Sequence, residues 1–199
     1  MGEGQVLRFA SVSSTQDVAR ELPIGSIVVA DHQVAGRGRL ERRWEAPPRT
    51  ALLVSFVLQT NPLLSLAAGV AAAEACGQGV RLKWPNDLLL DGRKLGGILV
   101  ETRDDKAVCG IGINLTSSPE GAAQLSEPRD QLLDRLRERM SVWTSAPGQV
   151  VLGRWRELSA TLGRRVRING VEGLAEDIGS HGELIVDGVA YVSGSVTHL

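Results

Sequence analysis

Apolar positions in the first 116 residues predict several β-strands. Residues 5–12 alternate between apolar and polar side chains, as in a strand with one buried face. Longer apolar and β-branched runs predict buried strands at 25–33, 50–59, 80–105 and 106–116. The run 80–105 contains a Pro-Asn-Asp turn at 85–87 and an Asp-Gly hairpin signal at 91–92, so we expect it to form more than one strand.

Four segments carry signals of helix. Residues 13–23 begin with Ser and Thr, which cap helices, and the alanine-rich residues 63–77 end near a glycine. Two later helices are predicted by apolar stripes at 128–143 and 150–163, the second ending at Gly163. The stripes consist of Leu132, Leu133, Leu136, Met140 and Trp143, and of Val151, Trp155, Leu158 and Leu162.

From Arg164 onward the chain changes to short β segments. Asn-Gly at 169–170 and Asp-Gly at 187–188 are two-residue hairpin signals. We therefore predict an α+β protein with two domains: a mixed β-sheet with packed helices over residues 1–160, and a small C-terminal β barrel over residues 161–199.

The composition narrows the class of protein. The chain has 199 residues, 43% of them hydrophobic, with 22 basic and 23 acidic residues, so no overall charge favours DNA or an anionic membrane. Cys76 and Cys109 lack metal-site or CxxC spacing and indicate free thiols of a reducing compartment. With no signal-peptide pattern, and with Glu74 inside its longest apolar run, the chain is predicted to be soluble and cytoplasmic.

A glycine- and arginine-rich segment, residues 31–49, is the first candidate site. It holds five Arg and two Glu in a stretch unsuited to regular structure. Gly36 and Gly38 allow close approach of the backbone to a ligand, and the alternating Arg37 and Arg39 offer planar donors to phosphate or carboxylate. Trp44 adds a flat surface for stacking on a base. The alternative is a solvated basic loop with no specific ligand.

A second candidate site is the segment 83–101. Lys83, Lys94 and the glycine pair 96–97 lie on neighbouring predicted strands, which suggests a pocket for an anion. Asn86 and Asp87 occupy the turn, where their oxygens could approach a metal ion or accept a proton. The alternative is a hairpin with solvated lysines and a glycine bulge.

Two further segments could line the same pocket. Hydroxyl groups at 13–15 suit a helix N-cap and could also bind a polar ligand head. The glycines of 110–115 do not form a dinucleotide fingerprint, because the third glycine is absent. P-loop, GxSxG and histidine metal motifs are absent from the sequence as well.

Together these motifs resemble biotin protein ligases. The matching stretches are S-T-Q at 14–16, Q-V-A-G-R-G-R-L-E-R-R-W at 33–44, the K-W-P-N-D to G-G-I-L-V-E block at 83–101, and G-I-G-I-N at 110–114. Glu41 replaces a glycine usual in the family, and Gln16 replaces an asparagine. Only eight residues precede Phe9, too few for a helix-turn-helix, so the resemblance is to the short form, for which no DNA partner is expected.

The resemblance implies a class II synthetase-like catalytic domain, an SH3-like C-terminal domain and a two-step reaction. Biotin and ATP, with Mg²⁺, would form biotinyl-5′-AMP, and the biotinyl group would pass to a lysine of a biotin carboxyl carrier protein. No membrane partner is implied, and a homodimer is left open.

The resemblance also implies residue roles. Catalysis is expected from Lys94, Arg37, Arg39, Lys83 and Asp87. Biotin would be bound by Ser14, Thr15, Gln33, Gly36, Arg37, Arg39, Lys94, Gly97 and Gly112. ATP would be bound by Arg37, Arg39, Trp44, Lys83, Asn86, Lys94 and Asn114. No firm metal ligand is expected, although Asn86 and Asp87 would lie near Mg²⁺.

Three other functions remain as alternatives. A lipoate-type ligase would use the same chemistry on another acid. A biotin-binding regulator with weakened catalysis would be supported by Glu41 alone. A nucleic-acid binder would use the basic loop and the barrel, but one Tyr and two Phe make a poor stacking surface.

Overall fold

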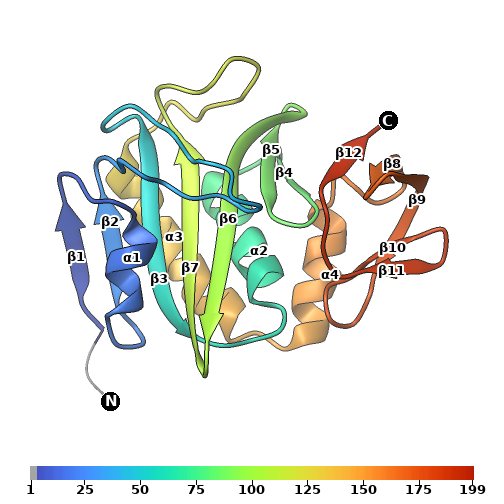
Figure 1. The fold of residues 1–199 in the computed structure, drawn as a ribbon, viewed down its shortest axis with the longest axis horizontal. Coiled ribbons are helices and arrows are strands. Elements are labelled where there is room, and N and C mark those ends of the chain that lie inside the picture. Colours follow the sequence, from blue (N-terminus) through green and yellow to red (C-terminus); the bar gives the residue numbers. More distant parts are fainter. Residues whose placement is uncertain (1–3) are drawn as a thin grey trace.

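The computed structural model describes residues 4–199 and contains twelve strands and four helices within them (Figure 1). The strands are β1 Val6–Phe9, β2 Ile27–Ala30, β3 Ala51–Gln59, β4 Val80–Lys83, β5 Asp87–Leu90, β6 Arg93–Arg103, β7 Lys106–Asn114, β8 Arg165–Ile168, β9 Val171–Ile178, β10 Leu184–Val186, β11 Val189–Tyr191 and β12 Val196–His198. The helices are α1 Thr15–Arg20, α2 Leu64–Cys76, α3 Arg129–Thr144 and α4 Gly148–Leu158.

Seven strands form the main sheet, in the order β1-β2-β3-β7-β6-β5-β4. Only the β1–β2 pair is parallel; the other neighbours run antiparallel. Helices α2, α3 and α4 cover one face, whereas α1 packs on the other face near the β1 edge (Figure 1). The predicted α+β class with a mixed sheet and packed helices is confirmed.

Strand periodicity decides which side chains meet which helices. On β7, Cys109, Ile111 and Ile113 are buried in the core shared with α2 and α3. Residues of the opposite parity face α1 or the cavity described below, because successive side chains of a strand point to opposite faces. Helix α2 is apolar almost all round, which suits its burial between the sheet and the outer helices α3 and α4.

Five strands form the C-terminal sheet, in the order β11-β10-β9-β8-β12, with antiparallel pairing throughout. The Asn-Gly and Asp-Gly turns at 169–170 and 187–188 adopt positive φ at both central residues and connect two-residue hairpins, as predicted. Apolar residues of this sheet belong to the same buried cluster as the main core.

The end of α4 differs from the sequence prediction. The stripe predicted a helix up to Gly163, but α4 ends at Leu158. Ser159 is extended, and its Oγ accepts hydrogen bonds from the N–H groups of Thr161 and Leu162. The N–H of Ala160 donates to the carbonyl of Leu82 at 2.7 Å, so contact with β4 competes successfully with another helical turn.

Candidate active site

Three glycines form the floor of a cavity that the predicted site residues line. Gly97 on β6 pairs with Gly112 on β7, and Gly112 pairs with Leu53 on β3, so these positions face the same side of the sheet. Asp87 on β5 continues the row beside Gly97, and Gly110 lies two residues along β7 from Gly112. The absence of side chains at the glycines leaves a hollow over strands that are otherwise packed.

This hollow is a cavity of about 190 Å³. The residues predicted for the site that line it are Ser14, Thr15, Gln33, Arg37, Arg39, Trp44, Lys83, Asn86, Asp87, Lys94, Gly97 and Gly112. They come from the start of α1, the segment 31–49, the end of β4, the β4–β5 turn and strands β5, β6 and β7. The fold therefore brings the separate motifs of the sequence into one place.

Gly36 and Asn114, two other predicted site residues, do not line the cavity. A Cβ at Gly36 would lie 2.3 Å from the carbonyl oxygen of Trp44, so this glycine permits close packing within the loop. Asn114 is 3% exposed, and its Nδ2 donates to the carbonyl of Ala123 at 3.0 Å. Asn114 thus secures the chain after β7, and its role toward ATP stays a prediction.

Positive charge gathers at the β4–β5 end of the cavity. Lys94 Nζ lies 2.6 Å from Asp87 Oδ1. Burial, with a smaller contribution from Lys94 and Arg42, lowers the pKa of Lys83. Burial also lowers the pKa of Arg39, which donates to the side-chain oxygen of Asn86 at 3.1 Å. Cations held together in this way are stabilised by an incoming anion.

The segment 36–44 closes over the floor. Its ends are tied by a hydrogen bond from the N–H of Trp44 to the carbonyl of Gly36, 3.0 Å long. Trp44 reaches down to the glycines: a Cβ at Gly112 would lie 2.6 Å from its ring, and one at Gly97 would lie 3.5 Å away. The flat surface predicted for Trp44 is therefore inside the cavity.

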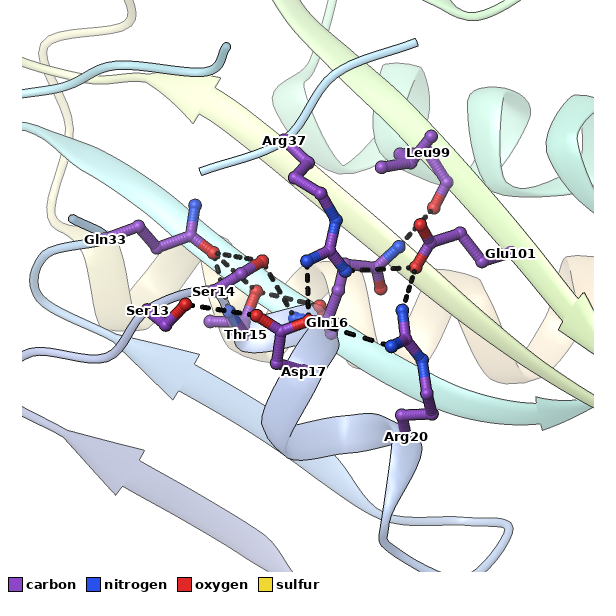
Figure 2. Close-up of polar contacts among 11 residues, drawn as sticks. Ser13, Ser14, Thr15, Gln16, Asp17, Arg20, Gln33, Arg37, Leu99 and Glu101 are labelled. Atoms are coloured by element: carbon purple, nitrogen blue, oxygen red, sulfur yellow. Dashed lines mark hydrogen bonds and ion pairs between the residues drawn. The ribbon is translucent and has the colours of Figure 1, made fainter. Parts of the chain in front are cut away.

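A polar cluster surrounds Gln33 at the α1 end of the cavity (Figure 2). Gln33 Oε1 accepts hydrogen bonds from the N–H of Thr15 at 2.7 Å and from its hydroxyl at 2.9 Å. Ser14 caps α1 by accepting from the N–H of Gln16 and also reaches Gln33 Oε1 at 3.5 Å. Ser55 donates to Thr15 from beneath at 2.8 Å. The amide oxygen of Gln33 is thus occupied, and its orientation is fixed.

Arg37 contacts carboxylates from two other elements (Figure 2). Its guanidinium donates to Asp17 Oδ1 at 2.5 Å and to Glu101 Oε2 at 3.2 Å. Burial acts to lower the pKa of Arg37, but the two carboxylates outweigh it and raise the pKa. Both arginines line the cavity, but Arg37 is paired with two carboxylates, whereas Arg39 donates to the neutral side chain of Asn86.

Sequence reasoning missed three contributions to the site. Trp84, 2% exposed, donates from its ring nitrogen to the carbonyl of Gly182 and so links the β4–β5 turn to the C-terminal sheet. Gln16 is 3% exposed, donates to the carbonyl of Leu99 and leaves its side-chain oxygen without a partner. Residues 194–196 bring the C-terminal sheet to the cavity wall. Only Trp84 gave a signal in the sequence, because a large aromatic residue is unusual beside the polar residues of a turn.

Within residues 4–199, no three His, Cys, Asp or Glu side chains cluster closely enough to hold a metal ion. Asp87 is the one carboxylate among the described residues that line the cavity, and Lys94 already pairs with it. These donors fit a Mg²⁺ ion held chiefly by substrate phosphates, which is the usual arrangement at nucleotide sites. None of the helices described has the length and apolar character needed to cross a membrane.

The family model for biotin/lipoate A/B protein ligases matches residues 8–116, more than half of the chain. The chain belongs to this family. The resemblance predicted from the motifs is thereby confirmed, and the matched residues contain every cavity-lining motif of the main sheet.

Individual ligases of the family are similar over most of the chain. The biotin–[acetyl-CoA-carboxylase] ligase of Mycobacterium tuberculosis is 34% identical, over 88% of this chain and 79% of that protein. The bifunctional ligase/repressor BirA of Bacillus subtilis is 37% identical, over 66% of this chain and 50% of its own. The structure of the Aquifex aeolicus biotin protein ligase in complex with biotin and ATP covers 98% of each chain, with 26% identity and a TM-score of 0.81.

Proposed function

We propose that the protein is an ATP-dependent biotin ligase. It joins the carboxylate of biotin to the α-phosphate of ATP, giving biotinyl-5′-AMP and pyrophosphate. A lysine amine of a biotin carboxyl carrier domain then attacks the acyl carbon, and AMP leaves. The observation that carries the proposal is one cavity holding a polar end around Gln33 and a cationic end around Lys83 and Lys94, in a chain that belongs to the ligase family.

The two ends of the cavity fit the two parts of biotinyl adenylate. The polar cluster of Ser14, Thr15 and Gln33 offers hydrogen-bonding groups to the ureido ring, which has one acceptor and two donors. A lipoyl ring offers no comparable groups, so this cluster favours biotin over the lipoate alternative. The distance between the ends is spanned by the glycine floor, against which an aliphatic chain could pack.

The cationic end supplies what the first step needs. A carboxylate and a triphosphate repel one another, and fixed positive side chains lower the cost of bringing them together and of charge in the transition state. We assign Lys94 to the reacting carboxylate and α-phosphate, with Lys83 and Arg39 on the phosphates. The nucleotide would bring Mg²⁺, for which Asp87 and Asn86 are the available protein oxygens.

The second step needs an unprotonated lysine amine on the carrier. A free lysine has a pKa of about 10.4, so in water it is almost entirely protonated near neutral pH. Asp87 is our candidate for orienting and deprotonating that amine once adenylate formation has drawn Lys94 toward the phosphate. Closure of the segment 36–44 would keep water from the reactive mixed anhydride.

Two further observations bear on the acceptor protein and on the cellular compartment. The Mycobacterium tuberculosis relative is named for acetyl-CoA carboxylase, so the carrier domain of that enzyme class is the expected acceptor. Cys76 and Cys109 are free thiols, as is usual for proteins of the reducing cytoplasm.

The alternative of a weakened regulator loses its support in the structure. It depended on Glu41, which would place a negative charge against phosphate. Glu41 is exposed and does not line the cavity. Its charge is therefore a small influence on a bound ligand.

One experiment tests the proposal. The protein is incubated with biotin, ATP, Mg²⁺ and a carrier domain, and the carrier is followed by intact mass. We expect the mass of one biotinyl group to be added, and pyrophosphate to be released before transfer. Lipoate in place of biotin serves as the control acid. Equal or preferential transfer of lipoate would contradict the biotin assignment, and absence of both adenylate and transfer would contradict a ligase.

A further inference from the structure

Four charged side chains form an alternating cluster beside the cavity, which we name the anchor cluster: Asp17, Arg20, Arg37 and Glu101 (Figure 2). Glu101 on β6 accepts from Arg37 at 3.2 Å and from Arg20 at 3.1 Å. Asp17 on α1 lies 2.5 Å from Arg37 and 3.9 Å from Arg20. Each carboxylate therefore lies between two guanidinium groups, and three separate elements are joined.

The pairing leaves Arg37 little charge to offer a ligand. Both of its terminal nitrogens donate to carboxylates. Partial burial acts to raise the pKa of Asp17, but the hydrogen bond and charge of Arg37 outweigh it and hold that pKa below its usual range. These carboxylates take two of the five N–H groups of the guanidinium, and their negative charge opposes a phosphate that approaches Arg37.

Arg39 is different. Its hydrogen bonds go to neutral oxygens, the side chain of Asn86 at 3.1 Å and the carbonyl of Gly194 at 3.5 Å. Burial, the largest influence, lowers its pKa, which means that its charge is incompletely compensated. Of the two arginines in the Gly-Arg-Gly-Arg stretch, Arg39 is therefore the one whose charge is available to bind an anion.

Backbone pairing within residues 36–44 links the position of Arg37 to the rest of the loop. The backbones of Arg37 and Arg43 form an isolated antiparallel β-bridge. Beside it, the N–H of Gly38 donates to the carbonyl of Arg42 at 2.7 Å. The next pair in this narrow ribbon joins Trp44 to Gly36. Fixing the Arg37 side chain against α1 and β6 thus fixes the ribbon, and with it Trp44 over the floor and Arg39 at the cationic end.

We propose that Asp17 and Glu101 are positioning residues of the ligase, and that Arg37 acts through them as the anchor of the loop instead of contacting the reacting groups. The inference rests on the proposed function, because its kinetic consequence is the retention of biotinyl adenylate. It revises the role expected for Arg37 from the sequence, which was a direct contact with biotin and phosphate.

The test uses Asp17→Asn, Glu101→Gln, Arg37→Ala and the double variant Asp17→Asn with Arg37→Ala. We expect each single variant to raise the KM for biotin and the dissociation rate of biotinyl adenylate on the order of ten-fold, with a much smaller change in kcat. The double variant should be no worse than Arg37→Ala, because both changes break the same anchor. Asp130→Asn is the matched control, since Asp130 pairs with Arg8 at an exposed site away from the cavity.

Two outcomes would overturn the proposal. One is a large fall in kcat for Arg37→Ala with near-normal kinetics for Asp17→Asn and Glu101→Gln, which would make Arg37 a direct contact of the reacting groups. The other is additive losses in the double variant. If Arg37→Ala does not fold, Asp17→Asn and Glu101→Gln still decide, because unchanged KM and dissociation rate in both would exclude anchoring.

Hydrogen exchange separates failure of this inference from failure of the proposed function. Amides of residues 36–44 are compared between wild type and Asp17→Asn without any ligand. We expect faster exchange in the variant even if the wild-type protein makes no adenylate. Equal exchange in the two proteins, together with normal ligase activity, would reject the anchor alone.

Discussion

At the scale of single residues, the site depends on how each charge is paired. Lys94 has Asp87 as a partner at 2.6 Å, so it is held at the cavity, although its side chain remains 46% exposed. Arg37 is occupied by two carboxylates, and Arg39 by neutral oxygens. Residue type alone therefore does not reveal which basic group meets the substrate.

Lys94→Ala should slow adenylate formation much more than it weakens biotin binding. Losing a cation that stabilises both reacting anions should raise the activation free energy by about 2–4 kcal/mol, the scale of a lost oxyanion donor. Pyrophosphate release measures the first step, and calorimetry measures biotin binding. Arg93→Ala, an exposed neighbour on β6, is the control. Turnover near that of wild type in Lys94→Ala would remove this lysine from the chemistry.

Glu41→Gly should slow the dissociation of biotinyl adenylate. Leu40 and Glu41 have φ of 54° and 59°, in the left-handed region. Relief of about 1–2 kcal/mol of strain at Glu41, less about 0.5–1 kcal/mol for the greater freedom of glycine in the open loop, leaves roughly 0–1.5 kcal/mol in favour of closure.

Glu41→Ala separates backbone from charge, because it removes the carboxylate but keeps the strain. We expect it to dissociate adenylate like wild type, and the slowing in Glu41→Gly to persist as salt is raised. If Glu41→Ala slows dissociation equally, and salt abolishes the effect in both variants, charge is the cause and strain is not.

At the scale of elements, the floor of the site is a product of strand register. Gly97, Gly112 and Leu53 share one row across three neighbouring strands. A glycine in a strand usually weakens packing, but here it makes room for Trp44 above the sheet. A methyl group added at Gly112 would collide with the indole ring of Trp44.

Gly112→Ala should displace Trp44 and weaken biotin binding. The new Cβ would lie 2.6 Å from the indole ring, so ring or strand must move, at a cost of about 1–3 kcal/mol for overpacking. Biotin titration measures the loss of affinity, and denaturant unfolding measures the loss of stability caused by overpacking. Gly153→Ala on α4 is the control, because a Cβ there meets nothing within 4 Å. Unchanged biotin affinity in Gly112→Ala would show that the ring does not rest on this floor.

Elements whose signals are local could be predicted from the sequence, and those that depend on distant contacts could not. The Asn-Gly and Asp-Gly hairpins were predicted because the turn residues themselves select positive φ. The end of α4 was missed because the carbonyl of Leu82, far along the chain, captures the N–H of Ala160. The same holds for the site: the motifs named most cavity residues, but the pairing of Arg37 with Glu101 joins positions 64 apart.

At the scale of the whole molecule, the C-terminal sheet is part of the site. Residues 194–196 line the cavity, and Arg39 reaches the carbonyl of Gly194. Trp84 connects the β4–β5 turn to the C-terminal part of the chain. Its backbone N–H donates to Thr161 Oγ1 at 3.1 Å, and its ring nitrogen donates to the carbonyl of Gly182. Loosening of the C-terminal sheet should therefore disturb the β4–β5 turn and, with it, Lys83 at the end of β4.

His198 makes this junction sensitive to acid. On β12, its Nε2 lies 3.2 Å from Thr161 Oγ1, the hydroxyl that also accepts from Trp84. Burial, followed by the charges of Lys83 and Arg164, lowers the pKa of His198 from 6.5 to about 4. Between these two values the unfolded chain binds a proton more readily than the folded protein, so the free energy of unfolding should fall as the pH drops through this window.

Denaturant unfolding at pH 7 and at about pH 4.5 measures that loss, within the window set by the pKa of His198. His198→Gln keeps a hydrogen-bonding side chain but cannot titrate, so its stability should change less than that of wild type over this range. His181→Gln, at an exposed site, is the control and should follow wild type. Because the junction holds the β4–β5 turn, adenylate formation by wild type should also decline below that of His198→Gln at low pH. Parallel stability curves for wild type and His198→Gln would mean that other groups cause the acid sensitivity.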